Sequence, residues 1–132
     1  MARKITVKLG SETAVAILMD GDAPRCCSTF WNALPMRLPA FHAKICNHEI
    51  MAPTPIVGME RENLQVPKAG DIGWWDLRNS INIWYDDPGP SGPLGPTALI
   101  GRVTENLKGL RKEGLKLWKK QGTMLCIFKL EE

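Results

Sequence analysis

The stretch KITVKLGSETAVAILMD, residues 4–20, decides the fold of this chain. Ile5, Val7 and Leu9 recur at every second position, which is the period of a strand with one buried face. Ser11 and Glu12 interrupt this pattern, and a second apolar run, TAVAILMD, follows at 13–20. The chain is therefore predicted to begin with an antiparallel β-hairpin.

Two segments have the spacing of amphipathic helices. The first is DAPRCCSTFWNALP at 22–35, where Asp22 is the expected N-cap, Pro24 lies in the first turn and Pro35 ends the pattern. The second is NLKGLRKEGLKLW at 106–118, with Thr104 as the expected N-cap. Both are predicted to bury one apolar face.

The remaining apolar segments indicate strands. PAFHAKICNHEIMAP at 39–53 forms one strand, or two with a bend near Asn47, and DIGWWDL at 71–77 pairs with INIWYDD at 81–87 as a hairpin. Further strands are expected from residue 97 and at 123–130, whereas DPGPSGPLGP at 87–96 suits only a surface loop. This order predicts a mainly β fold: a closed antiparallel eight-stranded barrel capped by two helices.

Length and composition narrow the class of protein. With 132 residues, of which 44% are hydrophobic and 23% charged, the chain is expected to form a single domain over residues 1–132. No apolar run is long enough to span a bilayer, so no membrane partner is expected. The opening MARKITVKLG lacks the apolar core of a signal peptide, which predicts a cytoplasmic location.

The basic residues form one cluster, in the second predicted helix. Its members share helical spacing and surround Glu113: Lys108, Arg111, Lys112, Lys116, Lys119 and Lys120. Together with a formal net charge of only +3, this pattern favours the solvated face of an amphipathic helix over a nucleic-acid patch. Nucleic-acid binding is therefore not predicted.

The four cysteines, at positions 26, 27, 46 and 126, do not have CxxC spacing. Free thiols are expected rather than a disulfide framework or a zinc site. His42, Cys46 and His48 share one face of a predicted strand, but at about 3.3 Å per residue the first two would lie roughly 13 Å apart and the last two roughly 7 Å apart, too far for one ion. Neither a metal nor another cofactor is expected.

Several short segments of the sequence resemble segments of known proteins. The run MDGDAPRCCSTFWNALP resembles the first helix of cyclophilins, and AFHAK resembles their Phe-His-Arg strand. The sequence is more similar to small prokaryotic cyclophilin-like proteins of largely unassigned function. The matching pieces are Ala23-Pro24, Trp31 with Ala33-Leu34-Pro35, His42-Ala43, Glu62-Asn63, Pro67 with Gly70-Asp71, and Trp84-Tyr85. The resemblance implies a cyclophilin-like barrel.

One departure from cyclophilins bears on function. Prolyl isomerases of this fold have an arginine directly after the Phe-His pair, and this sequence has Ala43 there. Their following Phe-Met-x-Gln motif and later glycine-rich stretch also have no match. Lowering an amide rotation barrier of ~20 kcal/mol needs a donor aimed at the twisting amide. Prolyl isomerase activity is therefore not expected.

Glu62 and Asn63 are the first candidate site residues. They end a loop before a strand, where binding groups gather on rigid scaffolds. A carboxylate beside a carboxamide can move a proton and orient a small polar ligand, and the same two residues can also simply fasten the loop backbone. His42 is a second catalytic candidate, or a core histidine bonded to a carbonyl. Lys44, on the same face, would help to hold an anionic substrate.

The aromatic residues of the hairpin complete the predicted site. Trp75 and Tyr85 are expected as walls of a substrate cleft, since each strand should present one aromatic side chain inward and one outward. The predicted function is a small-molecule enzyme that hydrolyses, isomerises or hydrates an amide-like, heterocyclic or carboxylate metabolite by acid–base chemistry. The alternative is a non-catalytic ligand- or peptide-binding module, or a subunit of a larger assembly. An exposed strand or aromatic patch that is buried against a second copy of the chain would also suit a homodimer.

Overall fold

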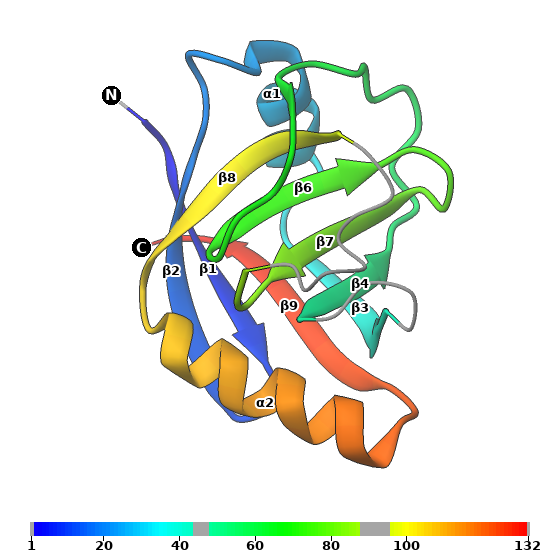
Figure 1. The fold of residues 1–132 in the computed structure, drawn as a ribbon. Coiled ribbons are helices and arrows are strands. Elements are labelled where there is room, and N and C mark those ends of the chain that lie inside the picture. Colours follow the sequence, from blue (N-terminus) through cyan, green and yellow to red (C-terminus); the bar gives the residue numbers. More distant parts are fainter. Residues whose placement is uncertain (1, 44–47, 88–95, 132) are drawn as a thin grey trace.

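The protein is an antiparallel β-barrel with one helix at each end (Figure 1). A computed structural model describes residues 2–43, 48–87 and 96–131. The strands are β1 (Lys4–Leu9), β2 (Glu12–Leu18), β3 (Met36–His42), β4 (Glu49–Pro53), β5 (Leu64–Gln65), β6 (Asp71–Trp75), β7 (Ser80–Trp84), β8 (Thr97–Glu105) and β9 (Met124–Leu130). The helices are α1 (Pro24–Asn32) and α2 (Leu107–Lys120).

The barrel closes through a contact between strands that are far apart in sequence. Neighbouring strands follow the order β2-β1-β9-β3-β4-β7-β6-β8, and β8 pairs back onto β2. The two-residue strand β5 adds to β8 beside this closure. The predicted closed eight-stranded barrel is confirmed, and so is the first hairpin, which runs from Lys4 opposite Ile17 to Leu9 opposite Glu12.

The strand alternation separates an apolar interior from an outer face. Ile5, Val7 and Leu9 are fully buried in the main core, as the period of two predicts. In the second hairpin, Trp74 and Tyr85 belong to this core, whereas Trp75 packs in a separate small cluster. One aromatic residue on each side of this hairpin therefore faces inward, as expected.

The helices close opposite ends of the barrel (Figure 1). Helix α1 buries Cys26, Cys27 and Phe30, and helix α2 buries an apolar stripe that includes Leu110 and Leu117. Neither helix is long and apolar enough to cross a membrane, within the residues that the structure describes.

Both predicted N-caps are wrong. Ala23, not Asp22, is the N-cap of α1, and it offers no side-chain cap. The N-cap of α2 is Asn106, whose side-chain oxygen accepts a hydrogen bond from the amide of Gly109 at 3.2 Å. Thr104 lies inside β8, because the pairing of β8 with β2 continues to Glu105. Tertiary pairing thus places the N-cap of α2 two residues after the expected position.

The segment from 39 to 53 forms two strands rather than one. The expected bend at Asn47 and most of the expected loop at 87–96 lie outside the described residues. The free-thiol prediction is confirmed for Cys26, Cys27 and Cys126, all of which are buried, while Cys46 lies outside the described residues.

Candidate functional site on the outer face of the barrel

His42 and Tyr85 meet inside the barrel, at the end that α2 covers. His42 is 4% exposed, and its Nδ1 and Nε2 atoms lie 2.7 Å from the carbonyl oxygen of Ala43 and from the hydroxyl of Tyr85. A carbonyl only accepts, so Nδ1 carries the proton and Nε2 accepts from the tyrosine. Both ring nitrogens are therefore occupied.

The electrostatics keep this pair neutral. Burial lowers the pKa of His42 below its usual range, against a smaller raising effect of the hydrogen bond to Ala43. Burial raises the pKa of Tyr85 to about 12, helped by the nearby charge of Asp86. At neutral pH the hydrogen bond thus joins an uncharged imidazole and an uncharged phenol.

Helix α2 covers the pair closely. The ring of Trp118 lies 4.8 Å from that of His42, centroid to centroid. A β-carbon at Gly114 would lie 2.6 Å from Cε2 of Tyr85, so only glycine lets the helix approach the ring at this point. These contacts give His42 and Tyr85 a role in fastening the barrel end.

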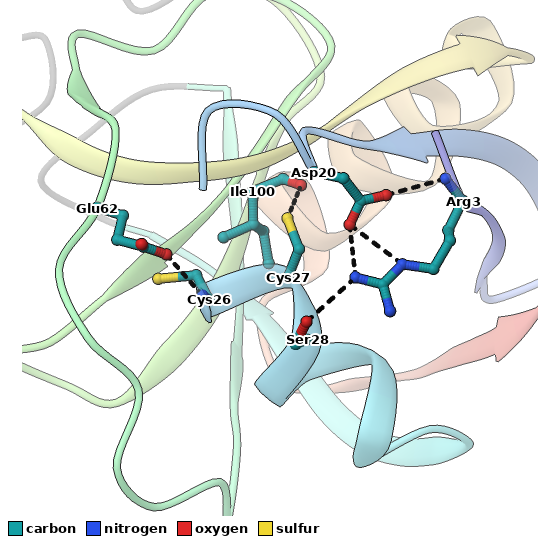
Figure 2. A network of polar contacts seen from close by, with 7 residues as sticks. All are labelled: Arg3, Asp20, Cys26, Cys27, Ser28, Glu62 and Ile100. Atoms are coloured by element: carbon teal, nitrogen blue, oxygen red, sulfur yellow. Dashed lines mark hydrogen bonds and ion pairs between the residues drawn. The ribbon is translucent and has the colours of Figure 1, made fainter. Parts of the chain in front are cut away.

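Glu62 lies at the start of α1 (Figure 2). Its Oε1 accepts a hydrogen bond from the backbone amide of Cys26 at 2.7 Å, and its Oε2 lies 3.6 Å from Nε of Arg25. The first amides of a helix have no partner within the helix. Glu62 therefore supplies, from a distant loop, the cap that Ala23 cannot.

Asn63 fastens the same loop to the barrel. Its Nδ2 donates to the carbonyl of Leu99 at 3.1 Å, and its own carbonyl accepts from the Leu99 amide at 3.2 Å. The residue adopts a left-handed conformation, with φ 51°, which asparagine tolerates better than most residues. The hydrogen bonds of Glu62 with Cys26 and of Asn63 with Leu99 thus hold backbone in place.

The predicted site residues do not come together in one place. Glu62 and Asn63 lie at the α1 end, His42 and Tyr85 lie at the α2 end, and Trp75 lies on the outer face of the barrel. Lys44 lies outside the described residues. The catalytic role of Glu62 and His42 and the binding roles of the other residues stay predictions.

A different group of residues, polar and apolar, lies together on the outer face of β3, β4, β6 and β7. Residues opposite one another in this sheet are Glu49 and Trp84, Met51 and Asn82, and Ser80 and Trp75. Phe41 of β3 lies opposite Met51 on the other side. We call these seven residues the outer-face patch: Phe41, Glu49, Met51, Trp75, Ser80, Asn82 and Trp84.

Three of the seven form a hydrogen-bonded relay. The Ser80 hydroxyl donates to Oδ1 of Asn82 at 2.6 Å, and Nδ2 of Asn82 donates to Oε2 of Glu49. All three side chains are at most 4% exposed. Ser80 fixes which way the asparagine amide points, and the amide in turn orients the carboxylate.

Apolar side chains border this relay. Met51 packs with Ala43, Phe41 and Trp75, and the last two are only partly buried, so the rim of the patch reaches solvent there. Trp84 is 1% exposed, and its indole N–H has no acceptor among the described residues. A buried donor without an acceptor costs about 1–3 kcal/mol, which an acceptor atom of a ligand or a water would relieve.

The site residues predicted from the sequence did not include Glu49, Ser80, Asn82 or Trp84. One local signal existed: Asn82 interrupts the apolar run of INIW, where a polar amide must find a buried partner. The partner itself depends on the register that sets Asn82 opposite Met51 and diagonal to Glu49.

The described thiols do not offer a nucleophile. Burial raises the pKa of Cys26 to about 11, and raises those of Cys27 and Cys126 to about 12. These groups therefore stay protonated at neutral pH, and the thiol is a much weaker nucleophile than the thiolate.

The chain belongs to a family described as "Protein of unknown function (DUF3830)", whose model matches residues 5–126. No curated protein sequence matches it. The predicted membership of an uncharacterised cyclophilin-like group is confirmed by this family and by the similar structures below.

Three solved structures share the fold. The structure of McbB in complex with tryptophan has a TM-score of 0.83 at 18% identity, over 96% of this chain and 44% of McbB, so the chain spans less than half of that protein. The hypothetical protein AF2241 from Archaeoglobus fulgidus has a TM-score of 0.71 at 19% identity, over 98% and 95% of the two chains. The Mimivirus cyclophilin has a TM-score of 0.61 at 15% identity, over 98% and 87%. The fold is cyclophilin-like.

Proposed function

We propose that this member of the DUF3830 family binds a small molecule at the outer-face patch and acts on it by acid–base chemistry, with Glu49 as the proton-transfer group. The substrate would be an amide-like, heterocyclic or carboxylate metabolite, and the reaction a hydrolysis, isomerisation or hydration. The observation that carries the proposal is the buried relay from Ser80 through Asn82 to the Glu49 carboxylate.

The relay is costly for a purely structural feature. Burying hydroxyl, amide and carboxylate groups against a sheet face costs free energy that well-packed apolar residues would not. Pre-oriented carboxylates of this kind act as general acids or bases, because a fixed orientation aims the lone pairs at the reacting proton. The relay therefore supports a site rather than a packing solution.

The apolar rim supports a ligand with a flat part. Phe41 and Trp75 are partly exposed next to the relay, and aromatic side chains favour planar groups. The similar protein McbB has been solved with tryptophan bound, which supports a ligand of that size class here. The indole N–H of Trp84, which has no acceptor in the described part of the chain, would suit an oxygen of the ligand.

Prolyl isomerase activity is not part of the proposal. Ala43 takes the position at which prolyl isomerases similar to this chain have arginine. It packs against Met51 at the edge of the patch. The relay presents a carboxylate, which accepts hydrogen bonds, whereas polarising an amide nitrogen or carbonyl needs a donor. We expect no acceleration of cis/trans exchange in a proline tetrapeptide. A cytoplasmic location and a homodimer remain predictions.

The test is a thermal-shift screen of small metabolites followed by a turnover assay with two matched variants. Glu49→Gln keeps the size of the side chain but removes its capacity to take up a proton, and we expect turnover to fall by roughly 10²–10⁴-fold. Glu62→Gln makes the same change at the α1 end and should retain activity.

The possible results separate the candidate sites. Loss of turnover in Glu62→Gln with retention in Glu49→Gln would move the site to the α1 end and refute the proposal. A metabolite that stabilises the protein without being converted would instead favour the binding module. Circular dichroism melting of both variants controls for loss of the fold.

A further inference from the structure

The exposed face of α2 carries a hollow that the outer-face patch does not involve. Its volume is about 360 Å³, and its lining residues follow one stripe of the helix: Lys108, Arg111, Lys112, Leu115, Lys116 and Lys119. The opposite stripe, which includes Leu110 and Leu117, is buried against the barrel. All six residues of the basic cluster are exposed, and five of them line the hollow.

The cations around the hollow exceed the nearby acids. Arg111, Lys112 and Lys116 pair with Asp86, Glu12 and Glu113 at 3.4, 3.5 and 2.8 Å. Lys108 and Lys119 have no ion pair among the residues that the structure describes. The paired cations remain about half exposed, so they also stay available to an outside anion.

The centre of the stripe is apolar. Leu115 is 36% exposed, and it lies one helical turn from Arg111, Lys112 and Lys119. A ring of cations around an apolar centre complements a segment with one apolar side chain flanked by carboxylates. A flat anionic membrane would contact the lysine tips but would not fill a hollow, and a nucleic-acid backbone would leave the leucine without an apolar partner.

We propose that the exposed face of α2 docks an acidic segment of another protein, with one apolar side chain of that segment in the hollow over Leu115. The binding is weak and salt-dependent, because the charged rim is solvated. It is independent of ligand binding at the outer-face patch.

The test uses a fluorescein-labelled helical peptide in which one leucine is flanked by glutamates at i±3 and i±4, and a second peptide of equal charge with serine in place of the leucine. Fluorescence anisotropy of the full chain should give a Kd below about 1 mM for the leucine peptide at low salt. The serine peptide should bind about tenfold more weakly, since it lacks the apolar anchor.

Protein variants locate the site. Lys108→Glu with Lys119→Glu, and separately Leu115→Glu, should each weaken the leucine peptide by about tenfold or more. Lys4→Glu with Lys8→Glu makes the same change of charge at two exposed positions of β1 and should change the Kd less than about twofold. Circular dichroism melting checks that every variant folds.

Three results would overturn the proposal. The first is the absence of binding up to about 1 mM peptide. The second is an equal loss of affinity in the β1 control, which would indicate only non-specific attraction. The third is tighter binding of phosphatidylserine vesicles or of a DNA duplex that depends on Lys108 and Lys119, which would assign this face to a membrane or to nucleic acid.

Discussion

The α1 end of the barrel and the outer-face patch each hold a carboxylate that accepts an N–H hydrogen bond, but the donors differ. Glu62 accepts from the backbone amide of Cys26, an amide that any helix start leaves without a partner. Glu49 accepts from the side chain of Asn82, which is itself oriented by Ser80. The first carboxylate solves a problem of the backbone. The second belongs to a buried polar cluster that strand packing alone would not require, and this is why the proposed chemistry is placed at Glu49.

The largest effect is expected from a second carboxylate in the patch. In Asn82→Asp, two carboxyl groups would lie within hydrogen-bond distance, and like charges so close cannot both ionise. One group would keep a proton in the folded state, so the variant should be most stable at low pH. It should lose about 3 kcal/mol or more of its free energy of unfolding as the pH rises towards 8. Urea unfolding from pH 4 to 8 measures this.

Asn32→Asp adds the same charge at an exposed position of α1 and serves as its control, with a change of less than about 0.5 kcal/mol. If Asn82→Asp showed no loss of stability at high pH, Asn82 and Glu49 would not be in contact in solution. The difference drawn above between Glu62 and Glu49 would then be lost.

A smaller effect, with the opposite pH dependence, is expected at Glu113, a carboxylate whose partners among the described residues are Lys116 and Ser11. Burial raises its pKa, but hydrogen bonds from Lys116 and Ser11 outweigh this and lower the pKa to about 2. A lowered folded-state pKa stabilises the protein above the unfolded value of 4.5, and this stabilisation is lost as the pH falls towards 2. Glu113→Gln should therefore cost up to about 3 kcal/mol at pH 7 and almost nothing near pH 2.

Urea unfolding of wild type and Glu113→Gln at several pH values checks this prediction. A difference in unfolding free energy that stays constant down to pH 2 would show that the hydrogen bonds do not depend on ionisation of Glu113. Glu113 could then no longer serve as the example of a carboxylate that stabilises the fold, to be compared with Glu49.

The smallest effect is expected at the α1 end. Glu62→Ala removes the cap on the Cys26 amide and should cost about 1 kcal/mol of unfolding free energy. Glu60→Ala removes only an exposed pairing with Arg25, and should cost less than about 0.5 kcal/mol. Thermal melting compares the two. Equal losses would mean that the charge near Arg25 matters, rather than the cap.

The strands were predictable because period two is a local property of the sequence. The spacing of Ile5, Val7 and Leu9 alone indicates that they share one face of a strand, whichever strands lie beside it. The same rule placed His42 and Phe41 on opposite faces of β3. The order of many strands and two helices then left few folds that could bury every apolar face. The helix caps were not predictable, because they depend on tertiary contacts. Glu62 of a distant loop caps α1, and pairing with β2 keeps Thr104 in β8.

The outer-face patch was beyond sequence reasoning for a similar reason. Glu49 and Asn82 are 33 residues apart in the sequence, and they meet only because β4 and β7 pair in one particular register. A slip of one residue would turn Asn82 to the interior. Glu62 and Asn63 attracted attention as adjacent polar residues, a pattern that loop fastening produces as readily as a site does.

The position of β9 has a consequence for how the protein is made. The last strand of the barrel lies between the first strand and the third, pairing with β1 on one side and β3 on the other. Because β9 is synthesised after β1 and β3, neither of these strands can form its pairing with β9 until then. Unpaired strand edges favour aggregation, so we expect this topology to fold slowly and to depend on protection from aggregation.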